Sequence, residues 1–376
     1  MSSHGIFKLM ELDVVEGLEG VIAAETVLSE VDGLAGRLVI RGRSLDDLAG
    51  RTSFETVTQL LFDGFFPALL DLAGLTAALG QARAAVFPHV AALDADLLAL
   101  SPIEAVRALI ARLPDGQDLD AALRLLAAPA VFTAAVIRAK RGLPPVAPDA
   151  ALGHAADSLR MIRGVAADPA EVAGLDTYLV TVCDHGLNAS TFAARVVAST
   201  QAGLTSAVLA GLGALKGPLH GGAPGPVIEM LDAISDPDQA EVWLEQALDR
   251  GDRLMGFGHR IYRVRDPRAD ALKNAVTALG GGHGAAQGRL ALAEAVEAAA
   301  LALLKTRKPD RPLQTNVEFY TALLLERLDL PADAFTCVFA MGRAAGWIAH
   351  AREQLSKGRL IRPASVYVGP HPLRAA

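Results

Sequence analysis

Residues 44–64 read SLDDLAGRTSFETVTQLLFDG, and this stretch decides the fold class because it begins a succession of helical segments. Ser44 precedes Asp46 and Asp47, the residue order of a capped helix start with acidic residues in its first turn. Ser53 repeats this arrangement before FETVTQLLFDG, whose apolar residues recur at helical spacing. Prolines punctuate the segments that follow, so the sequence predicts a series of short capped helices.

The composition also favours an all-α protein. Of the 376 residues, 52% are hydrophobic but only 5% are aromatic, so the core must consist mainly of Ala, Leu and Val, as in closely packed helices. This length is sufficient for a large core and two domains. Ahead of the helices, residues 21–33 and 37–42 are rich in β-branched residues around the turn signal Asp32-Gly33, which predicts a small antiparallel element.

Charge and apolar runs limit the function classes. The net charge of -7 argues against a nucleic acid or an anionic membrane as partner. The first twenty residues lack the basic and apolar regions of a secretory signal, so we expect a cytoplasmic protein. The uncharged stretch 196–215 is long enough to cross a bilayer, but its Ser, Thr, Gln and Gly residues favour a helix buried in a soluble protein. Cys183 and Cys337 lie in apolar stretches without metal-ligand spacing, and we interpret them as core residues.

Two stretches are predicted to be loops. RGLPPVAPDA, residues 141–150, has too many prolines for a helix. GGGHGAAQG, residues 280–288, is flexible by composition, and we expect His283 within it to be exposed to solvent because nothing in such a loop holds a side chain in place.

Two histidines lie at boundaries between predicted helices. His185 is in CDHGLNASTFAARVVAST, just ahead of a helix that Asn188 or Ser190 can cap, and such a position favours anions. His220 is in GALKGPLHGG, where glycine and proline interrupt a helix and leave the ring open to a ligand. An isolated histidine can equally serve only to hydrogen-bond within its loop. The glycine-rich loop around His220 matches neither a P-loop nor a dinucleotide fingerprint.

A third histidine lies beside a cluster of basic residues. The segment MGFGHRIYRVRDPR, residues 255–268, holds His259 behind two glycines. It also contains four arginines, which are Arg260, Arg263, Arg265 and Arg268. In a chain with an acidic surplus such a cluster predicts a local anion site, suited to two carboxylates or a nucleotide phosphate. A solvated helix start is the alternative for Arg260 and Arg265.

The carboxylate of Glu318 completes this set of polar groups. Glu318 follows Asn316 at the start of a strongly apolar helix, and taken alone it could simply interact with the helix dipole. Together with His220 and His259, it forms the combination of two histidines and one carboxylate that suits an enzyme removing a proton next to a carbonyl group. The sequence therefore indicates carbonyl chemistry.

A series of segments resembles the signature segments of bacterial and archaeal citrate synthases, in the order of that family and across nearly the whole chain. They are GLEGVIAAETVLSEVDG (17–33), LVIRGRSLDDLA (38–49), HGLNASTFAARVVAST (185–200), GALKGPLHGGA (213–223), MGFGHRIYR with DPRA (255–263 and 266–269), NVEFY (316–320), FAMGRAAGWIAH (339–350) and LIRPASVYVGP (360–370).

The resemblance implies an all-α homodimer. Each subunit would have a large domain, residues 1–220 and 325–376, and a smaller inserted domain, residues 221–324, that closes over the substrates. The family also implies condensation of oxaloacetate with acetyl-CoA, followed by thioester hydrolysis to citrate and CoA. Acetyl-CoA is then a substrate, and we expect no cofactor and no metal.

The resemblance further implies a role for each matching residue. His220 should bind the thioester carbonyl oxygen and stabilise the enol, Glu318 should take the methyl proton, and His259 should polarise the ketone of oxaloacetate. The oxaloacetate-binding positions are matched by His185, Arg268 and Arg343, with Asn188 and Phe339 lining the same pocket. Arg362 matches an arginine contributed across the dimer interface, and Arg263 falls where the family places a basic residue near a CoA phosphate.

These roles agree with the chemistry of the reaction. A methyl thioester is a very weak carbon acid, so the base must act together with an electrophile on the carbonyl oxygen, in a site from which water is excluded. A carboxylate and a neutral imidazole can do this. Arginines recognise carboxylates bidentately, and oxaloacetate has two carboxylates.

Two residues depart from the commonest pattern of the family. Pro224 stands where HGGAN has Asn, and Glu318 stands where NVDFY has Asp. The longer side chain displaces the carboxylate by roughly an Å, and misplacement on that scale can cost on the order of a hundredfold in rate. The loop after His220 differs as well, so we expect compensation and favour a working enzyme.

Two other functions stay open. A 2-methylcitrate synthase uses propionyl-CoA with the same catalytic residues, and one added methyl in an apolar pocket changes discrimination by only about 1–3 kcal/mol. The other alternative is a catalytically weakened paralogue that binds oxaloacetate or CoA for another purpose.

Overall fold

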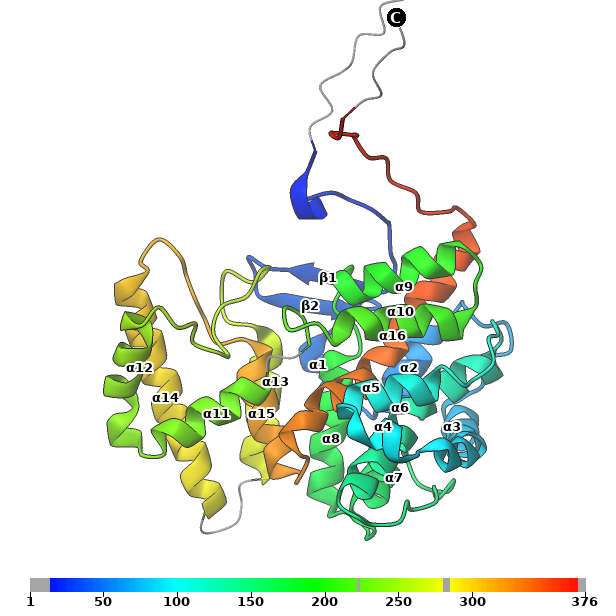
Figure 1. The fold of residues 1–376 in the computed structure, drawn as a ribbon, viewed down its shortest axis with the longest axis horizontal. Coiled ribbons are helices and arrows are strands. Elements are labelled where there is room, and N and C mark those ends of the chain that lie inside the picture. Colours follow the sequence, from blue (N-terminus) through cyan, green and yellow to red (C-terminus); the bar gives the residue numbers. More distant parts are fainter. Residues whose placement is uncertain (1–13, 222–223, 280–284, 371–376) are drawn as a thin grey trace, which may run out of the picture.

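The computed structural model describes residues 14–221, 224–279 and 285–370, and within them helices predominate (Figure 1). This confirms the all-α prediction. The first helices are α1 (Leu45–Leu48), α2 (Phe54–Phe62), α3 (Leu72–Val86), α4 (Ala95–Ala99), α5 (Pro102–Ile110), α6 (Leu119–Lys140), α7 (His154–Arg163) and α8 (Pro169–Val182). They are followed by α9 (Ala189–Ser199), α10 (Leu204–Leu215), α11 (Pro224–Ile234), α12 (Ala240–Asp249), α13 (Pro267–Leu279), α14 (Ala285–Arg307), α15 (Val317–Arg327) and α16 (Phe335–Lys357). Short 3-10 turns are η1 (Glu16–Leu18), η2 (Phe87–Ala92), η3 (Pro237–Gln239) and η4 (Ala332–Ala334).

A small antiparallel sheet precedes the helices, as the N-terminal pattern predicts. Its strands β1 (Ser29–Asp32), β2 (Arg37–Ile40) and β3 (Arg43–Ser44) lie in the order β1-β2-β3. Ser29 pairs with Ile40 and Asp32 with Arg37, so the predicted turn at Asp32-Gly33 joins β1 to β2. The Asp32 carboxylate accepts the backbone N–H of Leu34 at 3.0 Å and of Ala35 at 2.9 Å, which closes the turn.

The predicted N-caps are present. Ser44 Oγ accepts the backbone N–H of Asp47 at 3.2 Å, and Ser53 Oγ accepts that of Thr56 at 3.3 Å. Each bond satisfies an amide that the first helical turn leaves without an intrahelical partner. The proline-rich stretch 141–150 is free of regular secondary structure, as expected, whereas residues 280–284 with His283 lie outside the described part of the chain.

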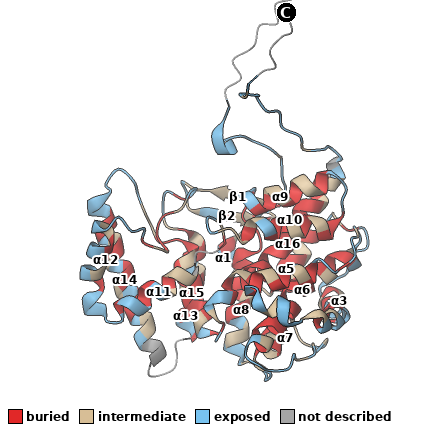
Figure 2. Ribbon diagram, in the orientation of Figure 1, coloured by how far each residue is buried: buried red, intermediate tan, exposed pale blue. Residues whose placement is uncertain are grey.

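Helices α6 and α16 form the centre of the larger group of helices, and Figure 2 shows this region as the most buried. α6 is long and apolar enough to cross a membrane by length and composition, but 89% of its most apolar stretch of residues is buried inside the protein. A helix in the core of a folded protein can have the same length and apolar composition. We therefore interpret α6 as a core helix.

The uncharged stretch 196–215 is not the single buried helix that its composition predicts. α9 ends at Ser199, and α10 begins at Leu204. Gln201 has a φ of 65° and Gly203 a φ of 97°, and this left-handed backbone turns the chain between the two helices. The residues of α10 that are buried include Leu204, Val208 and Leu212, while its other face is less covered.

Helices α11 to α15 lie together on one side of the molecule (Figure 1). α13 and α15 adjoin α8 of the larger group, where Gly174 leaves room for Leu279 and Leu324. The predicted small domain, residues 221–324, covers most of this side group. Its boundaries stay a prediction.

Both ends of the described chain run outward from the body of the protein (Figure 1). Residues 14–27 and 358–370 contain many exposed apolar side chains, among them Ile22 at 90% and Val368 at 93% exposure. Apolar residues gathered on extended segments favour contact with another protein surface.

A glycine in α3 provides a test of the packing between α3 and the proline-rich loop. A Cβ on Gly80 would lie 2.2 Å from the carbonyl oxygen of Ala150, whereas a Cβ on Gly288 of α14 would meet nothing within 4 Å. We expect Gly80→Ala to lower the free energy of unfolding by about 1–3 kcal/mol through overpacking. Gly288→Ala should raise it by up to about 1 kcal/mol through helix propensity. Thermal and urea denaturation would measure both, and equal effects would contradict this packing.

Candidate active site

The loop between α8 and α9 carries His185 and Asn188. Asn188 is the N-cap of α9, and its Oδ1 accepts the backbone N–H of Ser190 at 3.1 Å and of Thr191 at 3.2 Å. His185 is buried, and its Nε2 lies 3.1 Å from the hydroxyl of Tyr262. Burial, followed by the positive charge of Arg268, holds the pKa of His185 well below its usual value. His185 is therefore a neutral ring at physiological pH.

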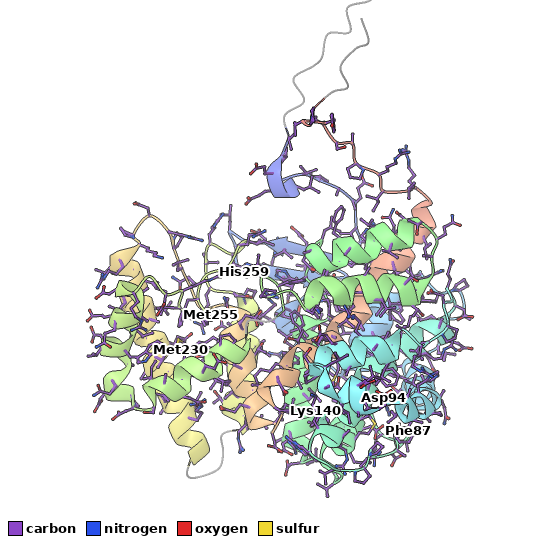
Figure 3. The ribbon with its side chains drawn as sticks, viewed as in Figure 1. Phe87, Asp94, Lys140, Met230, Met255 and His259 are labelled. Atoms are coloured by element: carbon purple, nitrogen blue, oxygen red, sulfur yellow. The ribbon has the colours of Figure 1, made fainter. Side chains whose placement is uncertain are left out.

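His259 faces His185 from the loop before α13, between the side group and the larger group of helices (Figure 3). The two rings meet edge to face, with 5.6 Å between their centroids. The Nδ1 of His259 accepts the backbone N–H of Ile261 at 3.0 Å and of Tyr262 at 3.1 Å. These donors place the proton of the neutral ring on Nε2. Burial and then Arg268 lower the pKa of His259 to about 4, so the ring is neutral.

Arg268 lies beside this proton. Its Nη2 is 3.2 Å from the Nε2 of His259. An arginine cannot accept a hydrogen bond, and the Nε2 of His259 carries a proton, so these are two donors side by side. An anionic or carbonyl oxygen between them would satisfy both.

Asp266 holds Arg268 in place. Its carboxylate accepts Arg268 Nε at 3.1 Å and Nη2 at 2.8 Å, and it also accepts the backbone N–H of Val317 at 3.2 Å. The carboxylate thus ties the start of α13 to the start of α15. Burial disfavours the charged guanidinium, but Asp266 outweighs this effect and raises the pKa of Arg268.

Arg343 of α16 is a buried cation, only 1% exposed. Its Nε donates to the carbonyl oxygen of Val182 at 2.6 Å, and its guanidinium carbon lies 4.8 Å from the centre of the Phe339 ring. Burial lowers its pKa to about 10, which leaves it charged at neutral pH. Within the described residues no carboxylate forms an ion pair with Arg343. An unpaired buried charge is costly, so this site calls for an anionic ligand.

His220 is held by Ser190. The Nε2 of His220 lies 2.8 Å from Ser190 Oγ, which also accepts the indole N–H of Trp347 at 3.1 Å and donates its own proton to Asn188 Oδ1 at 2.8 Å. Ser190 has one proton to donate. Because Asn188 Oδ1 receives it, the Nε2 of the neutral His220 ring donates to Ser190 Oγ; if the hydroxyl turns to His220 instead, the ring proton lies on Nδ1 and Nδ1 becomes the donor. Burial, then the charge of Arg343, lowers the pKa of His220 to about 4. The Phe339 ring lies beside His220, with 6.4 Å between ring centroids.

Glu318 lies in the first turn of α15. Asn316 caps this helix through the backbone N–H of Glu318, at 3.0 Å, which fixes the backbone from which the carboxylate extends. In the described part of the chain no group donates a hydrogen bond to that carboxylate. Burial raises the pKa of Glu318 to about 7, with Arg268 opposing the rise and Asp266 adding to it. A carboxylate with such a pKa is suited to general base catalysis near neutral pH.

The structure brings most of the predicted residues together and leaves two outside. One region is surrounded by six of them, namely His185, Asn188, His259, Arg268, Phe339 and Arg343. His220 and Glu318 lie near enough for these arginines to act on them, because Arg343 affects the pKa of His220 and Arg268 affects the pKa of Glu318. Arg263 is exposed in the loop after His259. Arg362 is exposed in the C-terminal segment, which runs outward from the body of the protein, and within the described residues its side chain forms no hydrogen bond or ion pair with the residues of this site.

Sequence reasoning missed three residues that position this site, namely Tyr262, Asp266 and Ser190. Asp266 had a signal, since it stands two residues before Arg268 and a carboxylate can hold a neighbouring guanidinium. The sequence pattern indicated only a helix-capping role for Ser190 and gave no sign of its contact with His220. The residues described here contain no cluster of three His, Cys, Asp or Glu side chains that could hold a metal.

Comparison with known proteins identifies the family. The chain matches the family described as citrate synthase, C-terminal domain, over residues 17–364. The chain belongs to the citrate synthase family. It is 38% identical to a citrate synthase of Haloferax volcanii, covering 97% of this chain and 98% of that protein. It is also 38% identical to a 2-methylcitrate synthase of Mycobacterium tuberculosis, covering 95% of this chain and 91% of that protein.

A solved structure agrees with this membership. The citrate synthase of Thermoplasma acidophilum, determined as a ternary complex with carboxymethyl coenzyme A and oxaloacetate, superposes with a TM-score of 0.82 at 29% identity, covering 97% of this chain and 98% of that chain. The chain is therefore an acyltransferase of the citrate synthase type, the class that converts acyl groups into alkyl groups on transfer.

The raised pKa of Glu318 predicts how activity depends on pH. A base with a pKa of about 7 takes up a proton as the pH falls, so kcat/KM should decline below pH 7 with a single acidic limb. Asp266→Asn removes a negative charge that raises this pKa, so the limb should move to lower pH. Rates measured from about pH 5 to about pH 9 would show both effects. A limb near pH 4 in the unmodified enzyme would exclude Glu318 as this titrating group.

Proposed function

We propose that this enzyme condenses oxaloacetate with the acyl group of acetyl-CoA and releases citrate and CoA. The observation that carries this proposal is Arg343, a buried guanidinium without a carboxylate partner among the described residues, facing the region of His185 and Arg268. A dicarboxylate provides the negative charge that this region lacks, and guanidinium groups bind carboxylates in a planar bidentate way.

The electrophilic half of the reaction is assigned to His259 and Arg268. The Nε2 of His259 and the Nη2 of Arg268 lie 3.2 Å apart, and both are donors that can bind neighbouring oxygens of one ligand. His259 donates to the ketone oxygen of oxaloacetate, and Arg268 to a carboxylate oxygen next to it. Because the ring is neutral, it polarises the ketone by a hydrogen bond and can transfer its proton when the oxygen becomes an alkoxide. His185, also neutral, lies edge to face with the ring of His259.

The nucleophilic half is assigned to Glu318 and His220. Glu318 removes a proton from the carbon next to the thioester carbonyl. When the Ser190 hydroxyl turns from Asn188 to donate to the Nε2 of His220, the Nδ1–H of His220 stabilises the developing enol oxygen. The new carbon–carbon bond forms between that carbon and the ketone carbon of oxaloacetate. Water then cleaves the thioester of the condensed product, which releases CoA.

The glutamate in place of the family's usual aspartate supports an adapted base. Its backbone is fixed by the Asn316 cap, and its pKa of about 7 suits proton removal at neutral pH. A decayed site would have no reason to retain the buried pairing of Arg268 with Asp266 and the unpaired Arg343. We therefore propose a working enzyme in preference to a weakened paralogue.

Propionyl-CoA is the second acyl donor that we propose. The 2-methylcitrate synthase of Mycobacterium tuberculosis has the same identity to this chain as the citrate synthase of Haloferax volcanii, 38%. The same base and the same two histidines would act on either thioester. The ratio of kcat/KM for the two thioesters would decide between the two activities, because it measures discrimination directly.

A homodimer in the cytoplasm is part of the proposal. The exposed apolar residues of segments 14–27 and 358–370 favour burial against a second copy of the chain. Arg362, in the second of these segments, would then reach the oxaloacetate site of the partner subunit. Arg263, exposed four residues after His259, would contact a phosphate of CoA.

Replacing Glu318 tests its role as the base. Glu318→Gln keeps the volume but removes the basic carboxylate, so condensation should fall by several orders of magnitude while oxaloacetate still binds. Glu318→Asp should slow the reaction by about a hundredfold if the site is adapted to the longer side chain. The measurement is proton exchange from the methyl group of acetyl-CoA alongside condensation. Undiminished exchange in the Gln variant would remove Glu318 from the mechanism, and faster condensation in the Asp variant would indicate a decayed site.

Mixing two inactive variants tests whether Arg362 acts in the partner's site. Arg343→Gln removes an oxaloacetate-binding charge from the site of its own chain. Arg362→Ala removes the arginine that its chain contributes to the site of the partner chain. In a hybrid dimer one site lacks both arginines and the other is intact, so an equimolar mixture exchanged through mild denaturation should recover about a quarter of the wild-type activity.

The same exchange applied to each variant alone is the control, and neither should recover activity. If Arg362 acted in the site of its own chain, both sites of a hybrid would be defective. No recovery in the mixture, with hybrid dimers demonstrated by native mass spectrometry, would therefore contradict the assignment of Arg362.

A further inference from the structure

The β1–β2 hairpin contacts both loops that carry the oxaloacetate-side histidines. Its strand β1 begins at Ser29 beside the loop of His185, and its turn, residues 33–36, lies against the loop that follows His259. In the described part of the chain no backbone-to-backbone hydrogen bond joins residues 183–188 directly to residues 256–266. The hairpin therefore bridges two segments that are otherwise connected only through side chains.

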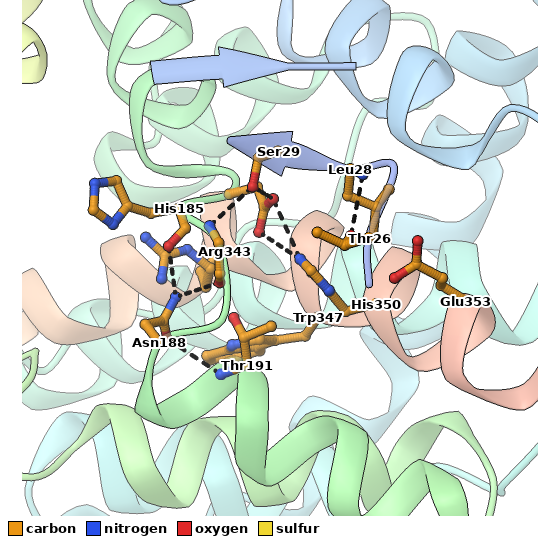
Figure 4. A network of polar contacts seen from close by, with 12 residues as sticks. Thr26, Leu28, Ser29, His185, Asn188, Thr191, Arg343, Trp347, His350 and Glu353 are labelled. Carbon is orange, nitrogen blue, oxygen red and sulfur yellow. Dashed lines mark hydrogen bonds and ion pairs between the residues drawn. The ribbon is translucent and has the colours of Figure 1, made fainter. Parts of the chain in front are cut away.

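Ser29 fixes the loop of His185 from both directions. Its hydroxyl donates to the Asp184 carboxylate at 2.5 Å and accepts the backbone N–H of Gly186 at 2.9 Å. These are the residues on either side of His185. One side chain of the strand thus determines the backbone position from which the ring projects. Figure 4 shows Ser29 at this junction, with His185 and Arg343 close by.

The Asp184 carboxylate also has a second hydrogen-bonding partner, His350. His350 of α16 lies with its Nε2 3.2 Å from Asp184 Oδ1, and its Nδ1 lies 3.0 Å from the Nη1 of Arg195. Arg195 can only donate, so Nδ1 accepts and Nε2 carries the proton toward Asp184. Glu353 pairs with Arg195 and also accepts the backbone N–H of Val27 at 2.9 Å, which connects these contacts to the segment just before β1.

The turn of the hairpin fixes the other loop by close contact. The carbonyl oxygen of Gly33 accepts the backbone N–H of Arg263 at 2.9 Å. A Cβ on Gly33 would lie 2.3 Å from the carbonyl oxygen of Ile261, and a Cβ on Gly36 would lie 2.7 Å from a side-chain methyl of Val264. The turn can approach the loop this closely only because these residues have no side chain.

We propose that the β1–β2 hairpin is a positioning element of the active site, with Ser29 and Gly33 as positioning residues that set His185 and His259 at the separation needed to hold oxaloacetate. β1 is a short strand with one loop at each end, so its length sets the distance between the two loops. Neither residue touches the reacting atoms; both act through the loops. This inference rests on the proposed binding of oxaloacetate between the two histidines.

Ser29→Ala tests the first contact. It removes one hydrogen bond from the Asp184 carboxylate, which keeps its contact with His350, and removes the acceptor of the Gly186 N–H, so the loop of His185 loses its connection to β1. We expect the KM for oxaloacetate to rise about tenfold, as for loss of a hydrogen bond to a charged group, with the KM for acetyl-CoA changed by less than about twofold. Ser29→Thr keeps the hydroxyl on a residue that suits a strand, and it should restore the oxaloacetate KM.

Gly33→Ala tests the second contact. Its φ lies outside the left-handed region, so alanine fits the backbone itself and the effect comes from contact with the Ile261 carbonyl. Displacing that loop by a few tenths of an ångström to an ångström should lower kcat by roughly tenfold to a hundredfold. Gly288→Ala, which also adds one methyl but in open space, is the matched control and should leave kcat and both KM values unchanged.

Thermal denaturation and steady-state kinetics of the wild-type protein and the variants separate the possible results. A selective rise in the oxaloacetate KM for Ser29→Ala, rescued by Ser29→Thr, supports the inference. An unchanged oxaloacetate KM overturns it, and so does an equal loss for both substrates that follows a lowered melting temperature. A wild-type protein that neither binds nor condenses oxaloacetate would instead contradict the proposed function itself, before any variant is compared.

Discussion

The Asp266 carboxylate is the interaction on which the geometry of the site depends. It accepts the backbone N–H of Arg268 at 3.0 Å as well as two guanidinium N–H groups, and it accepts the backbone N–H of Val317. The first set orients the arginine beside His259, and the last holds the start of the helix that carries Glu318. One buried charge therefore relates the electrophilic half of the site to the basic half. Burial is the main cause of the raised pKa of Glu318, and the negative charge of Asp266 adds to it, so the same carboxylate contributes to both the position and the basicity of Glu318.

Burial gives the charged groups of the site their chemical character. Desolvation keeps His185, His220 and His259 neutral and raises the pKa of Glu318, while Arg268 and Arg343 stay charged. Neutral imidazoles can donate hydrogen bonds to carbonyl oxygens without themselves being strong acids. Arg268 is paired with Asp266, so Arg343 is the guanidinium of the site that has no carboxylate partner among the described residues, and a substrate carboxylate would supply one. Bound oxaloacetate would in turn screen the arginines from Glu318 and favour a stronger base, which links substrate binding to activation of the base.

Local features of the fold and site were predictable from the sequence, and distant contacts were not. Ser44, Ser53 and Asn188 are caps in the structure because capping depends on a hydrogen bond to a residue two or three positions away. The turn at Asp32-Gly33 is likewise local. The bond of His220 to Ser190 and the contact of Gly33 with Ile261 join residues far apart in the chain, and no spacing reveals them. The break between α9 and α10 was missed because it depends on left-handed backbone at Gln201, a residue type that rarely adopts it.

The position of Glu318 limits where the site can adapt to its longer side chain. The Asn316 cap and the Val317–Asp266 bond fix the backbone at the start of α15, so the extra methylene cannot be absorbed by moving that helix. Arg268 is held by the same carboxylate, and His259 is held by the backbone N–H groups of Ile261 and Tyr262, which leaves little freedom on the oxaloacetate side. The remaining freedom is on the His220 side, where Pro224 starts α11 and also differs from the usual family pattern. The second departure from the family thus follows His220 by four positions in the chain, in the segment where the backbone can still shift to accommodate the first.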